Sequence, residues 1–330
     1  AVISINPNAI EEAKRADETR FIDEPHPIFG MPILLKDNIN TSGIPTTAGA
    51  VALKDNLADD AFIVQQLKKQ GAIILGKTNL SEWAYFFCGD CPSGYSAIGG
   101  QTLNPYGRTI FDTAGSSSGS GVAVAANYAA VAVGSETSGS IISPSSQNSL
   151  VGLKPTIGLV SRTGIIPISS TLDTAGPMAK NTIDAAILLS AISGYDKNDV
   201  STVTGAVTNF WTNLSTYGLK GKRFGVFKSH LNNPIYKKTI ENLKQQGVEI
   251  IEIQPQNMDF SSFVTFLNAD MKVDLPKYLE THSSVSANFK TVNDIVNFNS
   301  TQTTHQMGAA WRPDGKLRDF QRDVASATFN

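Results

Sequence analysis

Residues 59–76, DDAFIVQQLKKQGAIILG, contain a predicted helix that runs directly into a predicted strand. Asp59-Asp60 is expected to cap the helix, and Gly71 is expected to end it. Three apolar residues share one face of this helix: Phe62, Ile63 and Leu67. The apolar run 72–76 is typical of a buried strand. Because helix-then-strand order is the alternation of a parallel sheet covered by helices, this stretch predicts an α/β fold.

The same alternation extends in both directions along the chain. Strands are also predicted at 33–35, 130–134, 224–227 and 248–253, and helices at 9–20, 122–126, 184–193 and 235–246. We therefore expect one α/β domain, with a mixed, mainly parallel, twisted sheet covered by helices on both faces. The pattern weakens after about Ser300, and residues 312–330 are expected to form a helical or disordered tail.

The composition restricts the classes of function. The chain has 330 residues, of which 41% are hydrophobic and 17% charged, as in a soluble globular protein. No apolar run approaches the roughly eighteen residues of a membrane span, and the formal charge of −2 gives no electrostatic footprint for nucleic acid or an anionic membrane. The function classes that remain are chemistry on a small molecule and binding to another protein. Ala1 is not followed by a leader pattern, which leaves the compartment open, with the cytoplasm slightly favoured over secretion.

Cys88 and Cys91 form an isolated C-x-x-C pair. The pair is compatible with half of a zinc site, a redox pair or two unrelated thiols. No second Cys or Cys/His pair stands at metal-ligand spacing, and the surrounding stretch is rich in turns rather than part of a βαβ unit. The sequence therefore favours unrelated thiols and predicts no metal site.

The segment 88–121 is rich in Gly, Ser, Thr and Pro. It runs directly into the small-residue helix at 122–126, which a flexible linker between domains would not do. Its Gly-rich end, 115–121, has no lysine for phosphates and does not match G-x-G-x-x-G, so a nucleotide site is disfavoured.

Two modes of serine activation fit this segment. Residues 115–119 match G-x-S-x-G, the nucleophile elbow of α/β-hydrolases, with Ser117 at its centre and His282 or His305 as candidate bases. The histidines, however, stand in no obvious motif. A lysine that burial keeps neutral is the other possible base. Lys36 directly follows the buried strand 33–35, at a strand end where active sites of α/β sheets gather.

Seven blocks of the chain resemble the amidase signature family. They are Gly30 to Asn38, Gly76 to Trp83, Gly99 to Tyr106, Ala114 to Ser120, Gly134 to Ser140, Val151 to Thr156 and Leu172 to Ala179. They follow the order and approximate spacing of the family over about residues 30–196. The resemblance implies an enzyme that hydrolyses or transfers amides with a Ser-cisSer-Lys triad and without metal or cofactor.

Carried over by motif, the resemblance makes Ser140 the nucleophile, Ser116 the bridging serine and Lys36 the base. It implies a cis peptide between Gly115 and Ser116, and an oxyanion site at the backbone of Thr137, Ser138, Gly139 and Ser140. Gly89 and Asp90, with the loop through Ser93, Gly94 and Tyr95, are expected to line the substrate pocket. The domain is expected to span 1–300, with a catalytic core at 30–196, a pocket-shaping region at 200–300 and a tail of unknown role at 301–330.

Departures from the family pattern refine the expected function. Ile142-Ser143-Pro144 follows the nucleophile region where many members have an arginine. This disfavours the A subunit of a glutamine-dependent aminoacyl-tRNA amidotransferase, whereas Glu136 and Ser138 resemble the peptide-amidase branch. We expect a small or peptide-like amide as substrate, with a catalytically silent or truncated amidase-like protein as the alternative. The sequence does not indicate the oligomeric state or the particular amide.

Overall fold

The computed structural model describes residues 1–19, 26–87, 91–215, 217–256, 259–286, 288–301, 309–311 and 317–319. The chain divides into two compact units, one made of Ala1–Phe210 and Thr265–Asn330 and the other of Trp211–Val264. Lys36, Ser116 and Ser140 all belong to the first unit.

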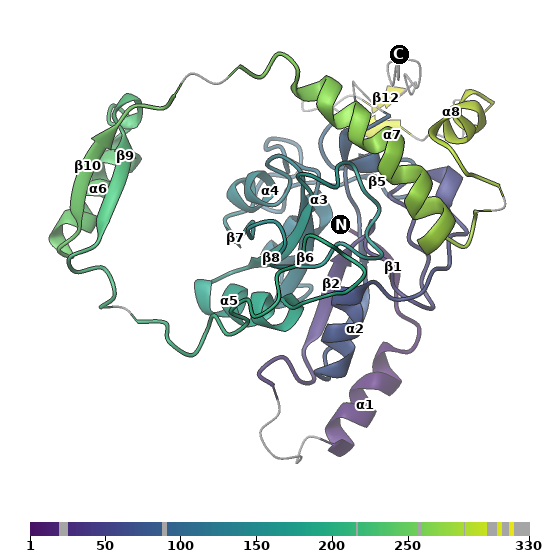
Figure 1. Ribbon diagram of the computed structural model, residues 1–330, viewed down its shortest axis with the longest axis horizontal. Coiled ribbons are helices and arrows are strands. Elements are labelled where there is room, and N and C mark those ends of the chain that lie inside the picture. Colours follow the sequence, from purple (N-terminus) through teal and green to yellow (C-terminus); the bar gives the residue numbers. More distant parts are fainter. Residues whose placement is uncertain are drawn as a thin grey trace. The chain divides into compact units, whose positions relative to one another are not determined.

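The first unit is built around a six-stranded sheet within the described residues (Figure 1). In spatial order its strands are β1 (Val2–Ile5), β3 (Ile73–Thr78), β2 (Pro32–Lys36), β6 (Val131–Glu136), β8 (Thr174–Ala179) and β7 (Val151–Gly152). Strands β3, β2 and β6 pair in parallel, and β7 shares their direction because it is antiparallel to β8. Strands β1 and β8 run the opposite way. The predicted mixed, mainly parallel sheet is confirmed.

Alternating side chains of β2 join two apolar layers on opposite faces of the sheet. Ile33 and Leu35 pack in the layer that contains α2 (Phe62–Lys69) and α5 (Thr182–Ile192). Leu34 packs in the layer that contains α3 (Ser118–Ala125). Complete burial of such side chains contributes about 1.5–3 kcal/mol each. Lys36 follows Leu34 by two residues and so emerges on the α3 face.

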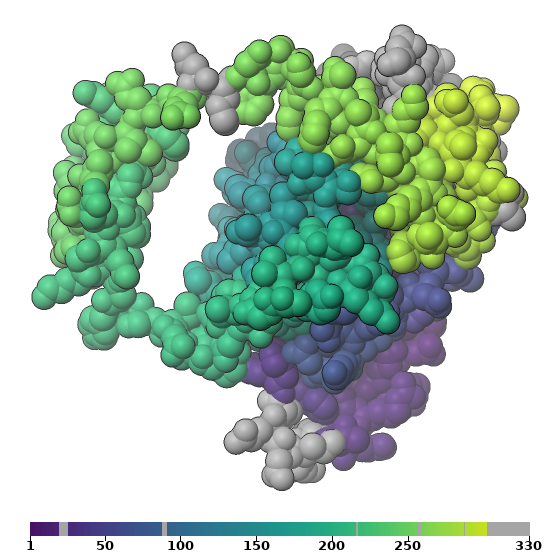
Figure 2. Space-filling view, viewed as in Figure 1, coloured from purple at the N-terminus to yellow at the C-terminus, as the bar shows by residue number. Residues whose placement is uncertain are grey.

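A third apolar cluster lies under α7 (Phe263–His282) and α8 (Val292–Ser300), which cover part of the surface in Figure 2. Met271, Leu275 and Leu279 of α7 and Ile295 of α8 are buried against residues of the short 3-10 helices Val51–Leu53 and Glu82–Tyr85. Part of the region expected to shape the pocket, from Thr265 onward, thus belongs to the first unit and packs within it.

The second unit contains the predicted strand-helix-strand alternation. Strands β9 (Arg223–Phe227) and β10 (Glu249–Ile253) pair in parallel, and α6 (Pro234–Gln245) connects them after the 3-10 helix Lys228–His230. Among the described residues of this unit, three apolar side chains are buried: Val226, Ile240 and Val248.

The remaining elements are short or peripheral. They are α1 (Ala9–Thr19), β4 (Tyr95–Ser96), β5 (Gly100–Gln101), α4 (Ile142–Gln147), β11 (Ala309–Trp311) and β12 (Leu317–Asp319). Strands β11 and β12 pair antiparallel, so the expectation that 312–330 is helical or disordered is wrong for Leu317–Asp319. Residues 312–316 and 320–330 of that tail lie outside the described residues.

Two local predictions also fail. Asp59-Asp60 does not cap α2, whose N-cap is Ala61 without a side-chain hydrogen bond. Asp60 instead accepts hydrogen bonds from Ser42 and pairs with Lys68. Cys91 is disulfide-bonded, so it is not the isolated thiol we expected, and no cysteine in the described part is free. Cys88 lies outside the described residues.

Candidate active site

Lys36 is a fully buried lysine at the carboxyl end of β2. Its Nζ contacts three oxygens: Ser116 Oγ at 2.7 Å, Ser135 Oγ at 2.9 Å and the Ser135 carbonyl oxygen at 3.1 Å. Burial lowers the pKa of Lys36 to about 7, because a buried ammonium loses its hydration. The carboxylates of Asp173 and Glu136 oppose that shift. A neutral amine is therefore present near neutral pH.

The segment around Ser116 has the backbone that the resemblance implies. The Gly115–Ser116 peptide is cis, which confirms that expectation. A Cβ at Gly115 would lie 2.4 Å from Ser81 Oγ and 2.5 Å from Tyr85 Oη, so glycine alone fits there without a shift of these groups. Ser117 N donates to the carbonyl oxygen of Ser140 at 3.2 Å and holds this segment beside the nucleophile candidate.

Ser117 does not form a nucleophile elbow. It is fully buried, and its hydroxyl donates to the carbonyl oxygen of Ser135 at 3.1 Å and accepts from Ser135 N at 3.2 Å. His282 lies on α7, where its carbonyl oxygen accepts from Asn40 Nδ2 and its ring stands 6.2 Å from that of Tyr278. His305 lies outside the described residues. Ser117 therefore has no histidine partner in the described part of the chain.

Ser140 ends a loop of small residues between β6 and α4. It is 7% exposed, and its hydroxyl makes no hydrogen bond with any described residue. Gly139 has a φ of +84°, which favours glycine. The backbone N–H groups of residues 137–140 likewise donate to no group in the described part. Four free donors beside a free hydroxyl are an arrangement suited to a developing oxyanion.

Two carboxylates anchor this loop at its ends. Glu136 Oε2 accepts from Ile141 N at 2.7 Å and Ile142 N at 3.0 Å. Asp173 Oδ1 accepts from Thr137 Oγ1 at 2.5 Å. Burial raises the pKa of Asp173 to about 6, although hydrogen bonds from Thr137 and from two backbone N–H groups, together with the charge of Arg162, lower it. The loop is thus held through both its backbone and a side chain.

A second buried lysine lies on the neighbouring strand. Lys77 of β3 pairs with Asp37 at 3.1 Å, and both side chains are fully buried. Lys77 Nζ also donates to Thr46 Oγ1 at 2.8 Å. This ion pair stands one residue from Lys36, because Asp37 follows it directly.

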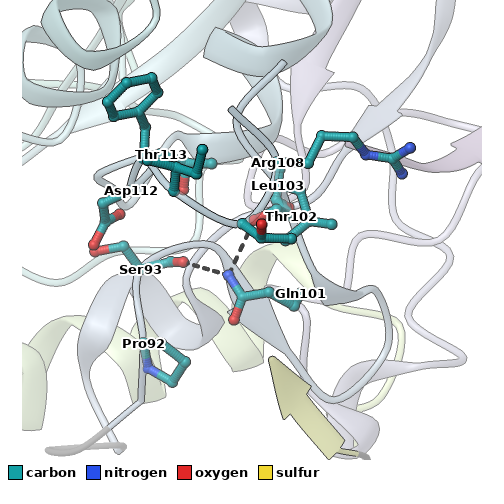
Figure 3. Close-up of a pocket in the computed structure, with 11 residues that line it drawn as sticks. Pro92, Ser93, Gln101, Thr102, Leu103, Arg108, Asp112 and Thr113 are labelled. Carbon is teal, nitrogen blue, oxygen red and sulfur yellow. Dashed lines mark hydrogen bonds between the residues drawn. The ribbon is translucent and has the colours of Figure 1, made fainter. Parts of the chain in front are cut away.

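The predicted substrate loop is only partly described. Gly89 and Asp90 lie outside the described residues. Ser93 borders a cavity of about 50 Å³, where its carbonyl oxygen accepts from Gln101 Nε2 at 2.7 Å (Figure 3). Ser93 Oγ also pairs at 2.7 Å with Tyr85 Oη, the group that stands against Gly115. This cavity is therefore connected to the cis peptide through two side chains.

Other classes of site were sought in the described part of the chain. No group of three or more His, Cys, Asp or Glu side chains there is arranged to hold a metal ion. None of the helices described is long and apolar enough to cross a membrane.

Comparison with known proteins identifies the family of this chain. A family model described as Amidase matches residues 1–328. The chain belongs to the amidase signature family. The X-ray structure of native peptide amidase from Stenotrophomonas maltophilia matches this amidase-family chain with a TM-score of 0.89 at 41% identity, covering 99% of this chain and 66% of that one. The expected fold and family are thereby confirmed.

Curated relatives of this amidase-family chain have two kinds of description. A probable amidase of Arabidopsis thaliana is 39% identical over 331 residues, which are 94% of this chain and 63% of that protein. The A subunit of the glutamyl-tRNA(Gln) amidotransferase of Lawsonia intracellularis is 42% identical over 253 residues, which are 74% of this chain and 51% of that protein. The chain thus spans between half and two thirds of the length of these relatives.

Sequence reasoning missed several residues around Lys36. Lys77 follows the apolar run 72–76 as Lys36 follows 33–35, a parallel that signals a second buried lysine. Asn38 and Ser135 carry no such signal, because the contacts of Ser135 with Asn38 and with Lys36 exist only once β2 and β6 pair.

Proposed function

We propose that this protein is an amidase that hydrolyses a carboxamide to a carboxylate and ammonia or an amine, through an acyl-enzyme on Ser140. The observation that carries the proposal is the 2.7 Å contact between Ser116 Oγ and a fully buried Lys36 whose pKa is lowered to about 7. A serine bound to a lysine that is neutral near neutral pH can pass on a proton.

In the proposed mechanism, neutral Lys36 takes the proton of Ser116 while Ser116 takes the proton of Ser140. Ser140 Oγ attacks the amide carbonyl, and the carbonyl oxygen becomes an oxyanion that faces the N–H groups of residues 137–140. The relay then reverses and protonates the leaving nitrogen as the C–N bond breaks. Water hydrolyses the ester on Ser140 through the same relay. The attacking water gives one proton to the relay, which returns it to Ser140 Oγ as the ester bond breaks.

A small or peptide-like amide is the substrate class that fits best. The solved structures that resemble this chain include a peptide amidase, and the loop beside Ser140 has small side chains that let a chain-like substrate approach. The net charge of −2 supports a small molecule or peptide rather than a nucleic acid as partner. We propose Ser93 and the cavity beside it as part of the substrate-binding region.

The amidotransferase A subunit is the second candidate, and the Lawsonia relative at 42% identity favours it. Ile142 and Ser143 argue against it, because the pattern of the A subunits has an Arg-Gln pair at these two positions. Both side chains are exposed here. A catalytically silent protein is the third possibility. Full burial of a lysine would be costly if that lysine had no function, unless the lysine were neutral or paired.

The test is ammonia release from a panel of aliphatic, aromatic and C-terminal peptide amides. Wild-type chain is expected to release ammonia, most rapidly from the peptide amides. Ser140→Ala and Lys36→Ala are expected to lose nearly all of that activity. Ser146→Ala is the matched control, because Ser146 is an exposed serine on the adjacent α4. Full activity in Ser140→Ala would refute the nucleophile assignment, and activity that requires glutamine and an aminoacyl-tRNA would favour the amidotransferase role.

A further inference from the structure

The contacts of Lys36 Nζ restrict where its lone pair points. A neutral amine has two hydrogens and one lone pair. The carbonyl oxygen of Ser135 can only accept, so one hydrogen of Lys36 is directed to it at 3.1 Å. The other two neighbours, Ser135 Oγ and Ser116 Oγ, are hydroxyls that can donate or accept. Which hydroxyl meets the lone pair decides whether Lys36 can act as a base on Ser116.

Asn38 determines the role of the Ser135 hydroxyl. Asn38 Nδ2 donates to Ser135 Oγ at 2.8 Å and occupies one of its lone pairs. The remaining lone pair can accept from Lys36 as long as the hydrogen of Ser135 has another acceptor. If the hydroxyl hydrogen of Ser135 had no other acceptor, it would point at the lone pair of Lys36. Lys36 could then not take the proton of Ser116.

A small cavity beside Ser135 offers space for such an acceptor. It measures about 20 Å³, and its lining includes the polar residues Asn38, Ser135, Thr137 and Asp173 together with Ala84 and three isoleucines. This volume is sufficient for one water molecule. Asn38 Oδ1 is buried and lacks a hydrogen-bond partner in the described part of the chain, so it offers an acceptor to such a water. A water bound there would accept the hydrogen of Ser135 and donate to Asn38 Oδ1.

We propose that Ser135, held by Asn38 and a water in this cavity, is a positioning residue that directs the lone pair of neutral Lys36 at Ser116. The inference rests on the proposed function, in which Lys36 is the base. The same arrangement also suits the protonated lysine, whose three hydrogens meet Ser116 Oγ, Ser135 Oγ and the Ser135 carbonyl oxygen. Only the bond to Ser116 changes during the relay.

Several charged groups surround Lys36 and set the background of its titration. Strand β2 contributes Asp37, β3 contributes Lys77 and β6 contributes Glu136. Asp173 precedes β8 and interacts with Arg162, and α3 carries no charged side chain. Ser135→Ala changes none of these groups, so a shift of the Lys36 pKa in that variant arises from the positioning contacts, whereas Asn38→Asp adds one negative charge.

Two substitutions are expected to move the pKa of Lys36 in opposite directions. Ser135→Ala removes an acceptor that stabilises the ammonium more than the amine, which lowers the pKa by about half a unit to one unit. Asn38→Asp places a carboxylate next to Ser135, and this negative charge raises the pKa of Lys36 by about one unit or more. If Ser135 had only a packing role, its substitution would lower activity without shifting the pKa of Lys36.

The experiment follows Lys36 directly by NMR in protein labelled with 13C at lysine Cε, with the resonance assigned from Lys36→Met. This titration is measured whether or not the chain is active. The pH dependence of kcat/KM for a peptide amide is the second readout, and its acid limb is expected to shift with the NMR pKa. Ser120→Ala is the matched control: it removes another fully buried hydroxyl, which contacts Thr78 rather than Lys36, and is expected to leave the pKa unchanged.

Opposite shifts in Ser135→Ala and Asn38→Asp support the inference. Shifts in the same direction, or values equal to wild type in both, overturn it. If Lys36→Ala and Ser140→Ala retain wild-type activity, the proposed function fails. If they lose activity while Ser135→Ala and Asn38→Asp titrate as wild type, only the positioning role fails.

Discussion

Lys77→Met is expected to destabilise the first unit strongly, because it leaves a buried carboxylate without its cation. The Lys77–Asp37 pair spans 3.1 Å with both side chains fully buried. Of the residues that the structure describes, Thr47 alone would then remain to hydrogen-bond the Asp37 carboxylate. Removal of one partner of a buried pair costs about 3–5 kcal/mol. At a slope of about 3 kcal/mol per M of urea, the unfolding midpoint falls by about 1–2 M.

The sign of the pH dependence follows from Asp37. Burial already raises the pKa of Asp37 above 3.8, and loss of Lys77 raises it further. A carboxyl whose pKa is higher in the folded state favours folding at low pH, and this contribution is lost as pH rises through the folded pKa. The deficit of Lys77→Met relative to wild type is therefore expected to be larger at pH 8 than at pH 5.

Urea unfolding followed by far-UV circular dichroism measures both effects. The double variant Asp37→Asn with Lys77→Met removes the uncompensated charge and is expected to recover part of the loss. Lys68→Met is the control, because the pair of Lys68 with Asp60 is partly exposed and such pairs contribute about 0–1 kcal/mol. A loss in Lys77→Met no larger than in Lys68→Met would refute the reasoning.

Three further predictions concern activity and stability. With the pKa of Lys36 lowered to about 7, kcat/KM of the wild type is expected to rise about tenfold from pH 6 to pH 8, and a flat profile across this range contradicts neutral Lys36 as the base. Gly119→Ala puts a Cβ 2.4 Å from the carbonyl oxygens of Ala1 and Asn79, so a loss of about 2 kcal/mol or more is expected in thermal unfolding. Gly218→Ala, whose Cβ would meet only Ser215 O at 3.5 Å, is its control. Asn181→Ala removes the side-chain cap of α5 and is expected to cost about 1 kcal/mol, which Asn181→Asp should largely restore.

The sequence predicts those parts of the fold whose signal is local. The helix predicted before Gly71 and the strands predicted at 33–35 and 72–76 follow from apolar runs, turn residues and helical spacing. The structure has them as α2 (Phe62–Lys69), β2 (Pro32–Lys36) and β3 (Ile73–Thr78). Helix α7 was missed because Pro276 lies inside it and interrupts the helical pattern. The failed cap at Asp60 depends on Ser42 and Lys68, which are distant in sequence and meet Asp60 only in the folded chain.

For the candidate site, too, some residues could be predicted from the sequence, whereas the contacts that form only in the folded chain could not. The resemblance indicated Lys36 and Ser116, and the structure brings them into contact. The surroundings that set the pKa of Lys36 were not predictable, because Ser135 and Asp173 lie 99 and 137 residues further along the chain. Their proximity results from the pairing of β2, β6 and β8.

Covalent labelling of Ser140 tests the central claim most directly. A serine-reactive sulfonyl fluoride is incubated with the folded chain at pH 8, and the modified peptide is identified by mass spectrometry. The account predicts stoichiometric modification at Ser140, lost in Lys36→Ala and retained in Ser146→Ala. A folded wild-type chain that stays unlabelled at Ser140, or that is labelled equally in Lys36→Ala, would contradict it.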